Sequence, residues 1–138
     1  MAASLLLDTC AAIWITENEE LSDAAVDAMD DAFRSNLPVY VSPITAWERG
    51  LLSAYGRLRS PVQPLTWFER LVRESKLTIA ALSPSILVEA WFLPGTIHRD
   101  PADRILASTA RALDLTLVTR DGPLLDYAEK GHIRAIAC

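Results

Sequence analysis

Four acidic residues lie where apolar segments end or helices begin, a placement that suits metal binding: Asp8, Glu48, Asp103 and Asp121. The segments around them contain no lysine that could neutralise their charges. Like charges gathered in a poorly hydrated site repel each other strongly, so such a cluster is costly without a cation. Because carboxylate oxygens select hard ions, we expect a Mg²⁺ or Mn²⁺ site. Such a centre can activate water and stabilise the leaving oxygen in phosphodiester cleavage.

Two of these acids also have a simpler structural explanation, which the residues alone leave open. Asp8 ends the apolar run SLLL and could cap the helix expected after it. Glu48 lies beside a predicted apolar stripe on its helix and could be a boundary residue. We expect that stripe to face the core and to comprise Ile44, Trp47, Leu51 and Leu52.

The stretch from His98 to Asp121 contains the other two acids. Asp100 followed by Pro101 is typical of a helix start, with Asp103 in the first turn. Apolar residues at three- and four-residue spacing give this helix a face to bury, formed by Ile105, Leu106, Thr109, Ala110 and Leu113. Residues 115–118 form an apolar strand, and Asp121 follows it. Because sites in open α/β sheets form outside the carboxyl ends of the strands, Asp103 and Asp121 are placed to share one site.

Strands and helices alternate along the whole chain. We expect strands at 4–8, 38–41, 77–82, 115–118 and 133–137, and helices at 9–15, 21–35, 43–55, 65–75, 84–92, 101–113 and 124–130. This alternation predicts an α/β fold, a three-layer α/β/α sandwich with a mostly parallel central sheet. No repeat or linker divides the chain, so residues 1–138 are expected to form a single domain.

The composition is that of a globular protein, with 51% hydrophobic residues and a net charge of −5. Seven of the 18 acids lie between residues 17 and 31, so the rest of the chain carries slightly more basic than acidic residues. With no apolar run of bilayer length and no secretory leader pattern, we expect a cytoplasmic protein that does not enter a membrane. Cys10 and Cys138 lack metal-type spacing, and Cys10 is expected to be buried.

Four sequence blocks resemble the signature blocks of the PIN-domain ribonucleases: LLLDT, SPITAWE, DPADRILASTA and LVTRD. The length and element order resemble the VapC-type toxins of bacterial toxin–antitoxin pairs. The resemblance implies a metal-dependent endoribonuclease that cleaves single-stranded or structured RNA, with Asp8, Glu48, Asp103 and Asp121 as ligands for Mg²⁺ or Mn²⁺. Thr119 matches the hydroxyl residue before the last acid. Asp100 matches an accessory acid, although helix capping explains it better.

The resemblance also implies partners: an RNA substrate, a cognate antitoxin and a second copy of the chain in a homodimer. Basic side chains of an inhibitor could pair with the four carboxylates and exclude metal. Apolar residues on the two helices that flank the Gly56 loop could hold the rest of such an inhibitor wherever they are exposed, and these are Trp47, Leu51, Trp67 and Phe68.

The remaining candidates have simpler interpretations. His98 and His132 are isolated, so surface or supporting roles are expected. Arg104 and Arg111 share a helix face and are expected to be solvated, although they could meet phosphate. Four aromatic residues at helical spacing are expected in the core, with a lesser chance of a partner contact: Trp67, Phe68, Trp91 and Phe92.

Other classes of function fit the sequence less well. A haloacid-dehalogenase-type phosphatase needs a second aspartate where this chain has Cys10. A receiver-like signalling domain needs a lysine after its last strand, and Lys76 and Lys130 do not stand there. The alternative that stays open is a catalytically silent PIN-like module that binds other proteins.

Overall fold

The computed structural model describes residues 2–58 and 60–138, and their strands form one parallel sheet. In chain order the elements are β1 (Leu5–Leu7), α1 (Thr9–Thr16), α2 (Asp23–Arg34), β2 (Val39–Val41), α3 (Pro43–Ala54), α4 (Pro64–Glu74), β3 (Thr78–Ile79), α5 (Pro84–Glu89), α6 (Pro101–Leu113), β4 (Thr116–Thr119), α7 (Gly122–Glu129) and β5 (Arg134–Ala137). The strand order is β3-β2-β1-β4-β5, and every neighbouring pair is parallel. The predicted α/β class and parallel sheet are confirmed.

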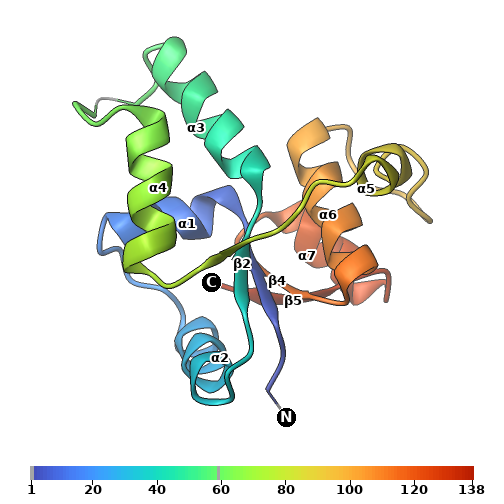
Figure 1. The fold of residues 1–138 in the computed structure, drawn as a ribbon. Coiled ribbons are helices and arrows are strands. Elements are labelled where there is room, and N and C mark those ends of the chain that lie inside the picture. Colours follow the sequence, from blue (N-terminus) through green and yellow to red (C-terminus); the bar gives the residue numbers. More distant parts are fainter. Residues whose placement is uncertain (1, 59) are drawn as a thin grey trace.

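Helices cover both faces of the sheet, which gives the predicted three layers (Figure 1). On one face, α1, α2 and α4 bury Ala11, Ala25 and Leu71 against the side chains of β1 and β2 that point to that face. On the other, α6 and α7 bury Leu106 and Tyr127 against the sheet. Alternate residues of β1 therefore belong to two different cores, which explains why its sequence is apolar throughout instead of alternating.

Serine or aspartate caps begin most of the helices, as the sequence indicated. Ser42, Ser83 and Asp100 each stand before a proline and accept a hydrogen bond from a backbone N–H of the first turn. Asp8 and Asp121 cap α1 and α7 in the same way. Because α1, α3 and α7 begin just after parallel strands, and α6 runs back toward the next strand, their first turns gather at the carboxyl edge of the sheet.

Several burial predictions are wrong. On α3 the side chains that face inward are Thr45 and Arg49, whereas Trp47 and Leu51 are 59% and 43% exposed. Half of the predicted apolar stripe is therefore exposed, whereas Ile44 and Leu52 are partly buried and Ile44 packs against the core. Leu113 on α6 is exposed as well.

The burial predicted for the aromatic residues is right for α4 and wrong for the residues after α5. Trp67 and Phe68 are core residues, as expected, but Trp91 and Phe92 follow the end of α5 and are exposed. Cys10, expected to be buried, is exposed, whereas Cys138 is buried. Strand β3 is only two residues long and exposed, because it lies at the outer edge of the sheet.

Within residues 2–58 and 60–138, no helix combines the length and apolarity needed to cross a membrane.

Candidate metal centre

Asp8 lies at the end of β1 and is 4% exposed. One carboxylate oxygen accepts a hydrogen bond from the N–H of Ala11 (2.7 Å), which caps α1, and the other accepts one from the hydroxyl of Thr119 (2.5 Å). Burial raises the pKa of this carboxyl, and the charge of Asp121 adds to the effect, although both hydrogen bonds oppose it. The helix-capping role and a place in the site are therefore compatible in one residue.

Glu48 lies in the second turn of α3 and is partly buried. The hydroxyl of Thr9 donates a hydrogen bond to its Oε1, and Thr9 in turn lies 3.1 Å from the hydroxyl of the buried Thr45. This contact joins the second turn of α3 to the first residue of α1. Burial raises the pKa of Glu48, and the charges of Asp100 and Asp8 raise it further, although the Thr9 hydrogen bond opposes this.

Asp103 and Asp121 converge on one side chain, His98. The Nε2 atom of His98 lies 3.2 Å from Oδ2 of Asp103 and 3.5 Å from Oδ2 of Asp121. These three residues offer ligand atoms that all lie within 4.8 Å of one another. Asp121 also caps α7 by accepting from the N–H of Leu124 (3.0 Å).

Asp103 is the carboxyl most affected by its surroundings. Burial raises its pKa from 3.8 to about 7, and the charges of four other acids contribute in the same direction, those of Asp100, Asp121, Glu48 and Asp8. The four acids predicted from the sequence are thus near enough to influence one another. Among the described residues, no lysine or arginine forms an ion pair with any of them. A divalent cation fits such a set of oxygen donors.

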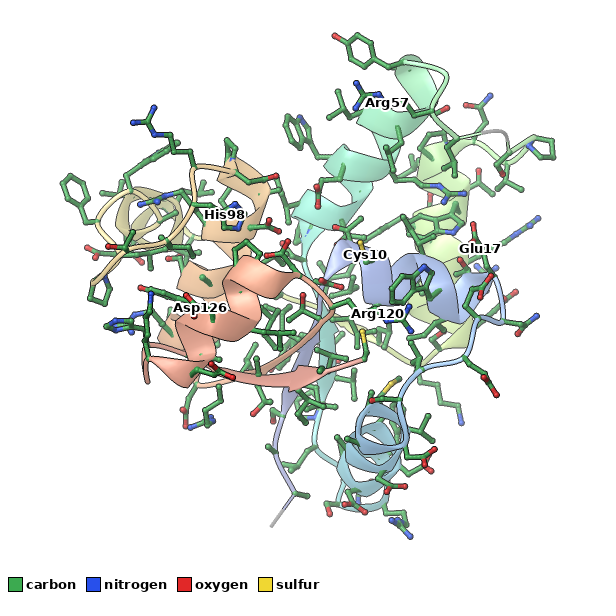
Figure 2. The ribbon with its side chains drawn as sticks, turned by 180° about the vertical axis from the view of Figure 1, so that it is seen from behind. Cys10, Glu17, Arg57, His98, Arg120 and Asp126 are labelled. Atoms are coloured by element: carbon green, nitrogen blue, oxygen red, sulfur yellow. The ribbon has the colours of Figure 1, made fainter. Side chains whose placement is uncertain are left out.

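His98 was not among the site residues predicted from the sequence, which gave it a surface or supporting role. It lies on the loop before α6 (Figure 2). Arg104 holds this loop, because its guanidinium donates to the carbonyls of Ala90 (2.8 Å), Ile97 (3.3 Å) and His98 (3.3 Å). The expectation that Arg104 is a solvated surface residue is wrong. The only signal in the sequence was that His98 precedes the capped start of α6 by two residues.

Asp100 has the capping role expected of it. Its Oδ1 accepts from the N–H groups of Ala102 (2.9 Å) and Asp103 (3.3 Å). Thr119 is fully buried at the end of β4, where it donates to Asp8 and accepts from the N–H of Asp121 (3.0 Å). This one hydroxyl therefore connects the strand ends that present Asp8 and Asp121.

In open parallel α/β sheets ligands bind at the carboxyl ends of the strands, and the acidic side chains at that edge of this sheet offer oxygen ligands for a metal ion. The PIN domain family matches residues 5–130. The chain belongs to the PIN domain family.

One relative is close enough for the kind of activity to be compared. The chain is 30% identical over 125 residues to Ribonuclease VapC22 of Mycobacterium tuberculosis, a match that covers 90% of this chain and 92% of that protein. The chain is thus a homologue of a VapC-type ribonuclease.

Solved structures share the fold. The VapBC2 structure from Rickettsia felis, bound to a promoter DNA fragment, matches with a TM-score of 0.67 and 18% identity, over 96% of this chain and 97% of that one. FitAcB from Neisseria gonorrhoeae matches with a TM-score of 0.54 and 22% identity, over 96% of both chains. At these identities the likeness concerns the fold alone.

Proposed function

We propose that this protein is a metal-dependent endoribonuclease and the toxin of a toxin–antitoxin pair. The observation that carries the proposal is the convergence of Asp103 and Asp121, with Asp8 and Glu48 close enough to raise the pKa of Asp103. The relative named as a ribonuclease supports RNA as the substrate. We take the metal to be Mg²⁺ or Mn²⁺, because the four acids are hard oxygen donors.

In this proposal the protein holds the carboxylates in fixed positions with lone pairs free for a ligand. Each oxygen of Asp8 accepts one hydrogen bond from the protein and can accept a further partner. Thr119 and Thr9 orient Asp8 and Glu48 through their hydroxyls. A bound divalent ion would supply activation of the attacking water and stabilisation of the leaving oxygen.

RNA would approach the carboxyl edge of the sheet, where α3 and α6 begin. Four of the seven acids of segment 17–31 lie on α2, which begins beside the carboxyl end of β5 and runs toward the opposite end of the sheet (Figure 1). The later turns of α2 therefore carry their negative charge away from the proposed substrate path.

The proposed protein partner is an antitoxin that places basic side chains among the carboxylates. Three of the solved structures that share the fold are those of VapBC2, FitAcB and FitAB, the last bound to a DNA fragment. Of the apolar residues considered from the sequence, Trp47 and Leu51 are exposed and available, whereas Trp67 and Phe68 are buried and are not. Part of the exposed α3 face could instead be covered in a homodimer.

The catalytic proposal is tested with the purified chain and an unstructured, end-labelled RNA. We expect cleavage with Mn²⁺ or Mg²⁺, loss of cleavage in EDTA and recovery when metal is restored. A DNA strand of the same sequence is the control. A protein that binds metal, as shown by calorimetry, and yet leaves every RNA intact would support the alternative of a silent protein-binding module.

The toxin proposal is tested by expressing the chain with and without the small protein encoded beside it. We expect growth arrest by the chain alone, with co-purification and relief when both are expressed. Trp47→Gln with Leu51→Gln should weaken co-purification, whereas Val26→Gln with Phe33→Gln, on exposed positions of α2, should not. A chain that is harmless alone while it is well expressed and binds metal would contradict the toxin proposal.

A further inference from the structure

His98 presents a nitrogen atom to two carboxylates of the site, those of Asp103 and Asp121. Its Nε2 lies within 3.5 Å of both Asp103 and Asp121, yet among the described residues it has no hydrogen-bond partner of suitable geometry, although the atom is buried. A buried ring nitrogen without a partner carries a free-energy cost. The arrangement therefore needs an explanation beyond packing.

The position of this side chain is built by its surroundings. Arg104 binds the carbonyls of Ile97 and His98 itself, and the capped first turn of α6 follows directly. The ring of Trp91 lies against the guanidinium of Arg104, with the guanidinium carbon 5.5 Å from the ring centroid. The guanidinium of Arg104 thus joins the loop to α6, and in this arrangement the imidazole faces Asp103.

We propose that His98 is a ligand of the metal and makes the site select Mn²⁺ over Mg²⁺. This inference rests on the proposed metal centre and adds a nitrogen donor to its oxygen donors. Mg²⁺ strongly prefers oxygen ligands and releases its waters reluctantly, whereas first-row transition ions accept imidazole readily. One nitrogen of His98 and one carboxylate oxygen each of Asp103 and Asp121 lie within 4.8 Å of one another, so a single ion could contact all three.

The competing explanation is that His98 is a charged counterion. An imidazolium ion would pair with Asp103 and Asp121 and would have to leave before a metal could bind. The two explanations predict opposite effects of removing the imidazole. If His98 is a ligand, its removal weakens metal binding; if it is a counterion, its removal strengthens metal binding.

The first measurement compares metal affinities of the wild-type chain and His98→Gln. Mn²⁺ binding is followed by electron paramagnetic resonance, and Mg²⁺ binding by competition with Mn²⁺. We expect Mn²⁺ affinity to fall about tenfold or more and Mg²⁺ affinity to change less than about threefold. The control is His132→Gln, because the imidazole of His132 packs on Tyr127 and Gly95 and, among the described residues, forms no ion pair with Asp103 or Asp121, so both affinities should stay unchanged.

The second measurement detects the ligand atom itself. Electron spin echo modulation of bound Mn²⁺ should contain ¹⁴N couplings, and labelling with ¹⁵N-histidine should replace them. The chain has only two histidines, so loss of the signal in His98→Gln and its retention in His132→Gln assign it.

The outcomes separate this inference from the proposed function. Mn²⁺ binding without a histidine coupling, or equal Mn²⁺ and Mg²⁺ losses in His98→Gln, would overturn the ligand role while leaving the metal centre intact. Tighter Mn²⁺ binding in His98→Gln would establish the counterion instead. A wild-type chain that binds neither metal would contradict the proposed centre itself.

Discussion

The hydroxyl of Thr119 donates to Oδ2 of Asp8 at 2.5 Å, across 111 positions of the sequence. The hydroxyl oxygen of Thr119 also accepts a hydrogen bond from the N–H of Asp121 at 3.0 Å. Because β1 and β4 are neighbours in the parallel sheet, this one buried side chain fixes the relative positions of two acids. The candidate metal site is therefore coupled to the sheet by a hydrogen bond, in addition to the packing of its helices.

Thr119→Val should disturb both Asp8 and Asp121. The substitution keeps the shape of the side chain but leaves the buried carboxylate without its donor and the N–H without its acceptor. We expect a loss of about 1–3 kcal/mol in the free energy of unfolding, measured by urea denaturation. Thr119→Ser, which retains the hydroxyl, is the control and should lose less. Equal stabilities of wild type and Thr119→Val would contradict this role.

Asp103 should make the metal-free protein less stable as the pH rises. Its folded-state pKa of about 7 is above the ordinary value of 3.8, so between these values the native state holds a proton that the unfolded state has released. Stability then falls as the pH rises from about 4 to about 7. The raised pKa values of Asp8 and Glu48 act in the same direction.

Asp103→Asn should remove this cost. In EDTA at pH 8 we expect the variant to be more stable than wild type by about 1–3 kcal/mol, since each unit of pKa shift corresponds to about 1.4 kcal/mol and the coupled acids share it. At pH 4 the two proteins should unfold at similar denaturant concentrations. A variant that is less stable than wild type at pH 8 would show that the charge of Asp103 is compensated within the protein.

A bound divalent metal ion should raise the free energy of unfolding, which the repulsion among the acids lowers in the metal-free protein. With Mn²⁺ at about 100 times its dissociation constant, the wild-type chain should gain about 2.7 kcal/mol, seen as a rise in Tm. Asp121→Asn should show a much smaller rise under the same conditions. An unchanged Tm for wild type at saturating metal would mean that the ion binds the unfolded chain equally well.

Asp100 should matter as a helix cap and not as a metal ligand. Asp100→Ala removes the acceptor for Ala102 and Asp103 and should cost about 1 kcal/mol of stability. Asp100→Asn keeps an acceptor and should retain both stability and RNA cleavage. If Asp100→Asn loses cleavage while its thermal unfolding is unchanged, the residue is a ligand and the capping interpretation is insufficient.

The strands and helix starts were predictable because each rests on local chemistry. Continuous apolar runs such as 4–7 predict strands buried on both faces, and a capping residue before proline marks a helix start, as at Ser42 and Asp100. Parallel topology then brings Asp8 and Asp121 to one edge of the sheet. This much of the candidate site follows from sequence order alone.

The orientation of α3 was not predictable in this way. Periodicity finds an apolar stripe, but it does not say whether that stripe faces the protein or solvent. Here the inward face carries Thr45, which completes a hydroxyl network, and Arg49, whose guanidinium lies 4.4 Å from the centroid of the Trp67 ring. Trp47 points outward as a result.

The position of His98 was not predictable either. A single histidine in a loop has no spacing pattern, and its place depends on the tertiary hydrogen bonds of Arg104. That arginine was in turn expected in solvent, because helix arginines usually are. Both errors have one cause: the loop from 91 to 100 is organised by contacts with α6 that no local pattern encodes.

The most direct test of the account compares RNA cleavage by wild type and Asp8→Asn at saturating Mn²⁺. Asparagine keeps an oxygen that can accept from Ala11, so the fold should persist, and circular dichroism provides that control. The loss of one ligand charge should reduce the cleavage rate by a factor of about 100 or more. If the folded variant cleaves as fast as wild type, the carboxylates at this edge of the sheet do not carry the chemistry.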